Sequence, residues 1–255
     1  MRVGIFGASG RIGQLLISLV RENPACSLSV IFLRKDSKIS VACDCVKTDC
    51  LEEFIQLCDI VIDFSLPEAS KTLFRALLKN PKPLVCGTTG LDGESFKLLD
   101  ELAIQVPVLH ATNMSFGVAL LNQIVGLVAE KFRDADIEIC EIHHRHKKDA
   151  PSGSALTLAE TCAEARGLDL AQVRISGRDG EVGARTKDEI AVMSLRGGDV
   201  AGRHTVGFYA DGEFLEFTHN ATSRLTFAKG ALKAAFWIFR QPKGRYKIAD
   251  LFKYA

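Results

Sequence analysis

Residues 138–155 form the most chemically capable stretch of the chain, with the sequence EICEIHHRHKKDAPSGSA. Half of the six histidines lie between His143 and His146, and three further cations lie among or beside them. A histidine or lysine can donate a proton near neutral pH, and clustered positive charge lowers the pKa of each cation toward that range. The stretch therefore favours a site that binds an anionic substrate and protonates it.

Three other interpretations of this stretch are weaker. A solvated charge run has no defined geometry, whereas Asp149–Ser154 is typical of a turn that leads into a helix N-terminus. A nucleic-acid surface carries interleaved aromatic side chains and a wider basic face. Surrounding cations repel a divalent ion from the histidines, and the cysteines from Cys43 to Cys58 lack paired C-x-x-C knuckles, so we expect no metal site.

The second informative motif is Gly7-x-x-Gly10-x-x-Gly13, which follows a short apolar run and opens a helical pattern. Glycines in this context allow a tight turn and let the backbone approach a pyrophosphate, which the helix N-terminus attracts. A purely structural glycine turn is the alternative. The alternation of strands and helices beyond the motif favours dinucleotide binding.

The end of the second expected strand bears on which dinucleotide binds. An acidic residue there would bind the ribose 2′-hydroxyl of NAD. The chain instead has Leu33, Arg34 and Lys35, with no acid before Asp36. Cations suit a 2′-phosphate, so we expect NADPH to bind at least as well as NADH. A solvated loop is the alternative interpretation of Arg34 and Lys35.

The first half of the chain predicts the scaffold that positions the glycine motif. Short apolar runs alternate with helical patterns that begin near Arg11, Ser65 and Asp92. This alternation predicts a Rossmann-type, doubly wound parallel sheet of α/β class. The strands are expected at Val3–Phe6, Leu28–Leu33, Cys58–Phe64, Leu84–Cys86 and Val106–Leu109.

The second half predicts a separate α+β domain with a mixed, largely antiparallel sheet. A deeply buried helix is expected over Phe116–Lys131, because that segment is apolar almost all round. A strand at Ile137–Ile142 precedes the histidine-rich loop, and a helix follows from Gly153 to Ala165. We expect antiparallel strands from Ile190 to Thr218, with glycine connections at residues 197–198 and 211–212, and a last helix over Phe227–Phe239.

Composition and charge narrow the class of protein. The 255 residues are 47% hydrophobic and 25% charged, with a formal net charge of +1, which excludes disordered and fibrous classes. Balanced charge argues against a nucleic-acid or membrane-surface partner. No apolar stretch reaches the roughly 18–20 residues of a membrane span, and the N-terminus lacks a secretory signal. We therefore expect a cytoplasmic protein whose eight cysteines are reduced thiols.

Together these residues resemble one family, 4-hydroxy-tetrahydrodipicolinate reductase (dihydrodipicolinate reductase). The run from Glu138 to Ala155 is similar to the family signature, and the similarity extends over nearly the whole chain. It also includes Gly7–Gly13, Ile62–Phe64, Gly87–Gly90, Ala111–Asn113, Arg196–Asp199 and Ser223–Phe227. The resemblance implies reduction of a cyclic dicarboxylate imine to tetrahydrodipicolinate with NADPH or NADH, with loss of water, in lysine and diaminopimelate biosynthesis.

The resemblance also implies roles for individual residues. His143 corresponds to the acid/base residue and Lys147 to a second proton donor, while His144, Gly153 and Ser154 would hold the substrate carboxylates. Arg34 would meet the adenosine ribose or its phosphate. The pyrophosphate would lie on Gly7, Ala8, Ser9, Gly10, Arg11 and Ile12, and the nicotinamide side would be lined by Gly87, Thr88, Thr89, Ala111, Thr112, Asn113 and Met114.

Family members usually form homotetramers through the second domain, and their last helix returns to the first. We therefore expect a cofactor domain of residues 1–112 and 226–255 and a substrate and oligomerisation domain of residues 113–225. Two departures stand out: Leu33 replaces an acidic residue, and Ser154 replaces the more usual threonine while keeping the hydroxyl.

Two rival functions remain open on the residues alone. A sugar or aspartate dehydrogenase would use the same scaffold, because many chemistries share this fold. A non-catalytic dinucleotide sensor would bind the cofactor without turnover. Neither rival explains the motif from Lys147 to Ala155.

Overall fold

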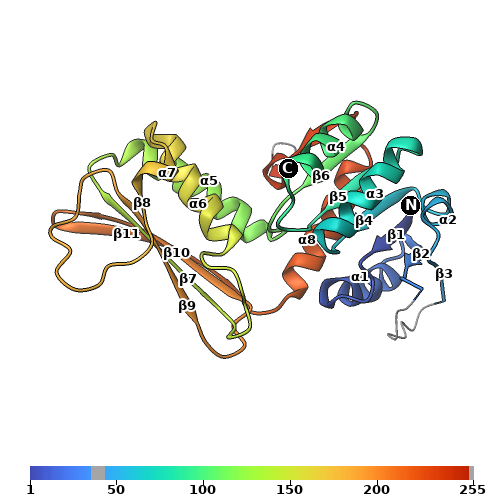
Figure 1. Cartoon of the computed structure of the whole chain (residues 1–255), viewed down its shortest axis with the longest axis horizontal. Helices are drawn as coiled ribbons and strands as arrows, with labels where there is room; N and C mark the ends of the chain where they lie inside the picture. The colour runs from blue at the N-terminus through green and yellow to red at the C-terminus, as the bar shows by residue number, and fades with distance from the viewer. Residues whose placement is uncertain (36–43, 253–255) are drawn as a thin grey trace. The chain divides into compact units, whose positions relative to one another are not determined.

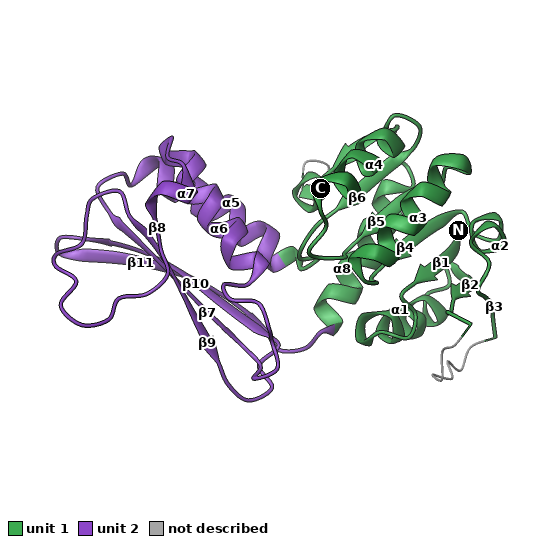
Figure 2. Cartoon of the chain, viewed as in Figure 1, with its two compact units in different colours: residues 1–116, 225–255 green, residues 117–224 purple. Residues whose placement is uncertain are grey.

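The computed structural model describes residues 1–35 and 44–252, which fall into two compact units. Unit 1 comprises Met1–Phe116 and Leu225–Ala255, and unit 2 comprises Gly117–Arg224 (Figures 1 and 2). The C-terminal segment thus returns to the fold of the N-terminal half. Asp36 and Cys43, which the sequence analysis singled out, lie outside the described residues.

Unit 1 is built on a seven-stranded sheet in the order β12-β6-β5-β4-β1-β2-β3. Every neighbouring pair is parallel, and the order reverses on either side of β1, which confirms the predicted doubly wound sheet. The strands are β1 (Arg2–Phe6), β2 (Ser27–Phe32), β3 (Val46–Thr48), β4 (Ile60–Asp63), β5 (Leu84–Cys86), β6 (Pro107–His110) and β12 (Gly244–Tyr246).

Helices cover both faces of this sheet, because alternate strand residues are apolar on each side. Ile5 and Ile62 belong to one core with α1 and α8, whereas Phe6 and Val61 belong to another with α2, α3 and α4. The helices are α1 (Arg11–Glu22), α2 (Leu51–Gln56), α3 (Pro67–Lys79), α4 (Gly93–Ala103) and α8 (Leu225–Ile238), with a 3-10 turn η1 (Ile248–Phe252) near the end.

Unit 2 contains a mixed five-stranded sheet in the order β11-β10-β7-β9-β8, as predicted. Its strands are β7 (Asp136–His143), β8 (Arg174–Ile175), β9 (Ile190–Arg196), β10 (Gly202–Ala210) and β11 (Glu213–Ala221). The helices α5 (Phe116–Lys131), α6 (Gly153–Arg166) and α7 (Leu170–Val173) pack their apolar residues on one face of it (Figure 1).

The expectation of neighbouring antiparallel strands over residues 190–218 is correct for β10 and β11 and wrong for β9. β9 pairs with β7 and β8, both in parallel, so β7 separates it from β10. The cause is the connection after β9, which crosses the end of β7. In that connection the Gly197 N–H donates to the His143 carbonyl at 2.9 Å, and the His144 N–H donates to the Val200 carbonyl at 2.8 Å.

The expectation that α5 is deeply buried is also wrong for unit 2 as described. Leu121, Val125 and Ala129 are buried against the sheet, but Leu120 and Leu127 are 48% and 58% exposed. A helix lying on a single sheet buries only the side that faces the strands. The apolar outer side of α5 therefore remains accessible in the single chain.

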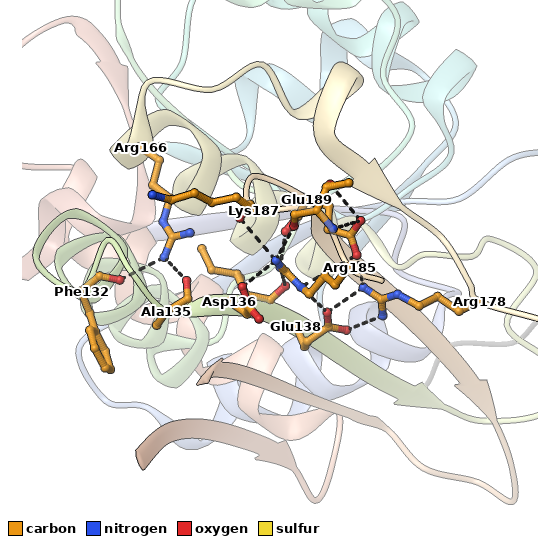
Figure 3. A network of polar contacts seen from close by, with 11 residues as sticks. Phe132, Ala135, Asp136, Glu138, Arg166, Arg178, Arg185, Lys187 and Glu189 are labelled. Atoms are coloured by element: carbon orange, nitrogen blue, oxygen red, sulfur yellow. Dashed lines mark hydrogen bonds and ion pairs between the residues drawn. The ribbon is translucent and has the colours of Figure 1, made fainter. Parts of the chain in front are cut away.

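A network of ion pairs fixes the loop between β8 and β9 to the first residues of β7. Figure 3 shows Arg178 and Arg185 among the carboxylates of unit 2. Arg178 makes two bonds to Glu138, at 2.9 and 3.0 Å, and Arg185 donates to Asp136 at 2.7 Å and to Glu138 at 3.2 Å. This anchoring holds the amino end of the strand whose other end carries His143.

Among the described residues, six cysteines carry free thiols, as predicted, but Cys45 is disulfide-bonded, so the prediction is wrong for that residue. Within residues 1–35 and 44–252, no helix is long and apolar enough to cross a membrane. Over the same residues, no three His, Cys, Asp or Glu side chains cluster in a way that could hold a metal ion.

Candidate active site

The carboxyl end of β7 places Glu141 and His143 on the same face of the sheet. Ile137 and Ile139 precede them on that face and are fully buried in the core of unit 2. Because side chains alternate along a strand, residues two apart point the same way. On this face of β7, two apolar core residues are thus followed by two ionisable residues at the end of the strand.

Glu141 is a carboxylate with 0% exposure that is saturated with hydrogen bonds. It accepts from His143 Nδ1 at 2.6 Å and from the backbone N–H of Ser152 at 3.1 Å. Arg196 donates to both carboxylate oxygens, each at 2.9 Å. Burial by itself would raise the pKa of Glu141, but the bonds from Arg196 and His143 outweigh it and hold that pKa at about 2.

The ionised Glu141 fixes the tautomer and orientation of His143. Since an anionic carboxylate only accepts, Nδ1 of His143 carries a proton. The ring is left with Nε2 for exchange with a substrate. A Cβ added at Gly202 would lie 3.0 Å from that Nε2, so the buried backbone of Gly202 packs closely beside the ring.

The pKa of His143 is lowered, but the main cause is burial and not the neighbouring cations that the sequence predicts. Burial is the main effect that lowers the pKa of His143 below its ordinary value, and the Glu141 carboxylate opposes it by favouring the imidazolium. Lys147 and Arg196 lower the pKa further, but less than burial does. A bound dianion would favour the imidazolium, so substrate binding can supply the proton-donating form.

His204 and Ser152 close the buried side of the site. His204 on β10 pairs in register with Glu141, is 2% exposed, and its Nε2 lies 3.0 Å from Ser152 Oγ. Ser152 is the N-cap of α6, where its Oγ accepts from the Ala155 N–H at 3.2 Å. Burial lowers the pKa of His204 to about 4. A neutral histidine therefore joins β10 to the start of α6.

The predicted substrate residues lie around the same strand end. Lys147 Nζ donates to both oxygens of Asp149 at 2.9 Å, and no bond joins it to His143 among the described contacts. His144 follows His143 directly and is half-buried. Gly153 and Ser154 begin α6, whose N-terminal dipole favours an anion. The structure thus gathers His143, His144, Lys147, Gly153 and Ser154 at one end of unit 2.

The glycine motif of unit 1 fits a pyrophosphate. Gly7 has φ +85°, and a Cβ there would lie 2.3 Å from the Phe64 carbonyl oxygen. A Cβ at Gly13 would lie 2.3 Å from the Gly7 oxygen, so these two positions exclude any side chain. Gly10 caps α1 without a side-chain acceptor, which leaves the first N–H groups of the helix available to an anion.

The other predicted cofactor residues lie at the carboxyl ends of neighbouring strands. Gly87, Thr88 and Thr89 follow β5, and residues 111–114 follow β6. Arg34 is exposed two residues beyond β2, beside the glycine motif that follows the adjacent β1. Ser9, Arg11, Thr89 and Thr112 are exposed, whereas Ala8, Thr88 and Met114 are buried and present mainly backbone.

From the sequence, Glu141 remains open between a carboxylate that orients a neighbour and an ordinary structural one, and Arg196, Ser152 and His204 receive no role in the site. Only Glu141 carried a local signal, because its spacing of two from His143 puts both on one strand face. Arg196 pairs in register with His143 across the β7–β9 ladder, which depends on a strand order that the sequence does not specify.

Comparison with known proteins covers both units. The family model described as dihydrodipicolinate reductase, N-terminus, matches residues 1–114, and the corresponding C-terminus model matches residues 117–252. The 4-hydroxy-tetrahydrodipicolinate reductases of Wolinella succinogenes and Helicobacter hepaticus are 56% and 58% identical to this chain over 250 residues, with 98% of each chain covered.

Solved structures agree on the fold. A dipicolinate-bound dihydrodipicolinate reductase from Paenisporosarcina sp. TG-14 is similar with a TM-score of 0.78 and 24% identity, covering 97% of both chains. A myo-inositol dehydrogenase from Corynebacterium glutamicum gives a TM-score of 0.60 at 16% identity, covering 96% of this chain and 90% of its own. The architecture is therefore shared with dehydrogenases that act on different molecules.

Proposed function

Because this chain belongs to the dihydrodipicolinate reductase family, it reduces 4-hydroxy-tetrahydrodipicolinate in lysine and diaminopimelate biosynthesis, and we propose that His143 supplies the proton. The product is tetrahydrodipicolinate, and the reductant is a nicotinamide cofactor, NADPH or NADH. The observation that carries the role of His143 is the 2.6 Å bond from its Nδ1 to the buried Glu141 carboxylate.

The proposed division of labour follows the two units. Residues 7–12, Arg34, residues 87–89 and residues 111–114 of unit 1 would hold the cofactor. Loss of water from the 4-hydroxy substrate gives the conjugated imine, to which the reduced nicotinamide, when bound, would supply a hydride. Electron density that builds up on the substrate must then be protonated, and a positioned imidazolium lowers that barrier.

His143 and Lys147 act on the substrate in different ways in this proposal. The imidazolium of His143 donates from Nε2, since Nδ1 is engaged by Glu141. Lys147, now paired with Asp149, exchanges that carboxylate for the substrate and acts as a second donor. His144, Gly153 and Ser154 bind the substrate carboxylates, which the N-terminal dipole of α6 also favours.

A coupled assay tests the proposed function. The substrate is generated in situ from pyruvate and aspartate semialdehyde by the preceding synthase, and NADPH consumption is followed by absorbance. Consumption that requires both precursors supports the proposal. Cofactor binding without turnover would favour a dinucleotide sensor, and turnover only with an inositol or another sugar would favour a different dehydrogenase.

We also propose a preference for NADPH, because Arg34 and Lys35 provide exposed cations where an acidic residue would bind the 2′-hydroxyl of NAD. NADH remains a second cofactor. The ratio of kcat/KM values for the two cofactors measures the preference directly, and a higher value for NADH would contradict it.

Assembly as a homotetramer through unit 2 is a further part of the proposal. The sheet face opposite α5 and α6 presents Leu195 and Phe214, which are 53% and 61% exposed. Large apolar side chains exposed on a sheet face are typical of subunit contacts. Sedimentation should give a tetramer that Leu195→Glu dissociates, whereas Leu66→Glu in unit 1 should not. A monomeric wild type would refute the assembly.

A cytoplasmic location is the last proposal. It rests on the six free thiols of the described residues, which persist in a reducing compartment and outnumber the disulfide-bonded Cys45. Fractionation of cells that express the protein from its own gene tests it, and recovery in a membrane or exported fraction would contradict it.

A further inference from the structure

A cluster of buried polar side chains in unit 1 takes no part in the proton transfer proposed above. Asp63, the last residue of β4, and Ser70 in α3 are fully buried, and Thr88 after β5 is 2% exposed. Burying a carboxyl group is costly unless it is hydrogen-bonded. Its partners therefore show which segments of the chain it holds in place.

Asp63 contacts polar groups of the loop after β4, of α3 and of the loop after β5. Its Oδ1 accepts from the Ser65 N–H at 3.0 Å, and its Oδ2 accepts from the Ser70 hydroxyl at 2.5 Å. The Thr88 hydroxyl lies 3.4 Å from Oδ2. Burial raises the pKa of Asp63, and the bonds from Ser70 and Ser65 oppose that effect.

Thr88 is the residue through which three strand ends are joined. Its Oγ1 accepts from the Ser65 N–H at 3.1 Å and lies 2.9 Å from Ser70 Oγ. Its carbonyl oxygen lies 3.1 Å from His110 Nε2 at the end of β6. Thr88 therefore links its own segment after β5 to the segment after β4, to α3 and to the last residue of β6.

The two threonines of the Gly87-Thr-Thr-Gly90 segment consequently differ in role. Thr89 is exposed, whereas the Thr88 hydroxyl is directed into the protein. The segment cannot shift freely toward β4, because a Cβ at Gly87 would lie 2.3 Å from the Phe64 ring. A glycine-flanked segment has little stiffness of its own, so its shape depends on these contacts.

We propose that Asp63 and Thr88 are positioning residues, which hold the backbone of residues 87–90 in the conformation that receives the nicotinamide side of the cofactor. This inference rests on the proposed cofactor function of unit 1. Thr88, which the family resemblance places among the residues that line the nicotinamide side, would then act through the shape of its segment, because its hydroxyl is directed into the protein. Precise placement of a binding segment depends on such supporting bonds.

The test compares Thr88→Val, which removes the hydroxyl at nearly constant volume, with Thr88→Ser, which retains it. The dissociation constant of NADPH is measured by fluorescence without substrate, alongside the melting temperature and the KM values of both substrates. Thr88→Val should raise the NADPH dissociation constant by roughly tenfold or more. Thr88→Ser and the exposed control Thr72→Val should remain within about twofold of wild type.

Asp63→Asn and Ser70→Ala provide the same comparison if Thr88→Val does not fold. Both should raise the dissociation constant and the KM of NADPH while leaving the KM of the dicarboxylate substrate unchanged. A merely structural role would reduce the folded fraction without changing either constant. Wild-type affinity in Thr88→Val or in Asp63→Asn, or equal losses in Thr88→Val and Thr88→Ser, would overturn the inference. A wild-type protein that does not bind NADPH would instead refute the proposed function.

Discussion

Nδ1 of His143 lies 2.6 Å from Oε2 of Glu141, a carboxylate that has no exposed surface. The contact joins residues two apart on β7, so the strand itself sets their relative orientation. Arg196 neutralises the carboxylate and keeps it ionised. A histidine held in this way has one ring nitrogen committed and the other available, which is the arrangement that a proton donor requires.

Replacement of Lys147 tests the second proton donor. Lys147→Ala should lower kcat by about two orders of magnitude, which is typical for loss of a general acid. The coupled assay with NADPH measures the effect, and Lys148→Ala is the control because that neighbouring lysine is exposed. Turnover close to wild type in Lys147→Ala would remove the residue from the mechanism.

Gly202→Ala tests whether the position of the His143 ring limits turnover. An alanine there would bring a Cβ to 3.0 Å from Nε2 and 3.4 Å from Cδ2, so the ring must shift. Gly202→Ala should lower kcat roughly tenfold or more by displacing the ring. Gly177→Ala is a matched control, since Gly177 has a similar φ of +159° to the +157° of Gly202 and a Cβ there meets nothing within 4 Å. Equal activity in the two variants would show that the position of the His143 ring does not limit turnover.

Burial of His204 predicts a dependence of stability on pH. Its pKa is lowered to about 4 in the folded protein, so between pH 4 and 6.5 the unfolded chain binds more protons than the folded one. Its contribution to stability is complete above pH 6.5 and is lost as the pH falls to 4, by roughly 3 kcal/mol. Urea unfolding across this range should show a smaller decline for His204→Gln than for wild type.

The exposed His146 provides the control for that series. His146→Gln should retain the wild-type decline in unfolding free energy between pH 6.5 and 4. Parallel curves for wild type and His204→Gln would mean that His204 is not the group that titrates.

We propose that Arg34 favours NADPH over NADH. Arg34→Ala should weaken NADPH binding by about tenfold, the effect of one charge-assisted hydrogen bond, and should leave NADH binding nearly unchanged. Arg240→Ala removes a comparable exposed cation elsewhere in unit 1. Titration of both cofactors at fixed salt measures the change, and an unaltered ratio of affinities would exclude Arg34.

The sequence was sufficient to predict the elements that carry strong local patterns. The strands of unit 1 alternate with helices, and β4 and β5 are continuous apolar runs, which is why the doubly wound sheet was predictable. Strands β3 (Val-Lys-Thr) and β12 (Gly-Arg-Tyr) were missed because, unlike the equally short β5, they contain no continuous apolar run. Burial of α5 was overestimated, because an apolar outer face is not distinguishable from a core face in one sequence.

The candidate site likewise contains some residues that are predictable from the sequence and others that are not. Continuous sequence motifs contain His143, Lys147 and the glycine motif, so their chemistry can be predicted from the sequence alone. Arg196 and His204 reach Glu141 only because β9 and β10 lie on either side of β7. Such a network depends on strand order and register, which involve residues about fifty positions apart and leave no local pattern.

A double-mutant cycle on Glu141 and His143 tests the central claim most directly. Turnover numbers are measured for Glu141→Gln, His143→Asn and the double variant, each confirmed as folded by circular dichroism. If Glu141 acts through His143, each single change should lower kcat by about two orders of magnitude. The double variant should then be no slower than His143→Asn. Losses that multiply in the double variant would contradict the account, because they would mean that the two residues act independently.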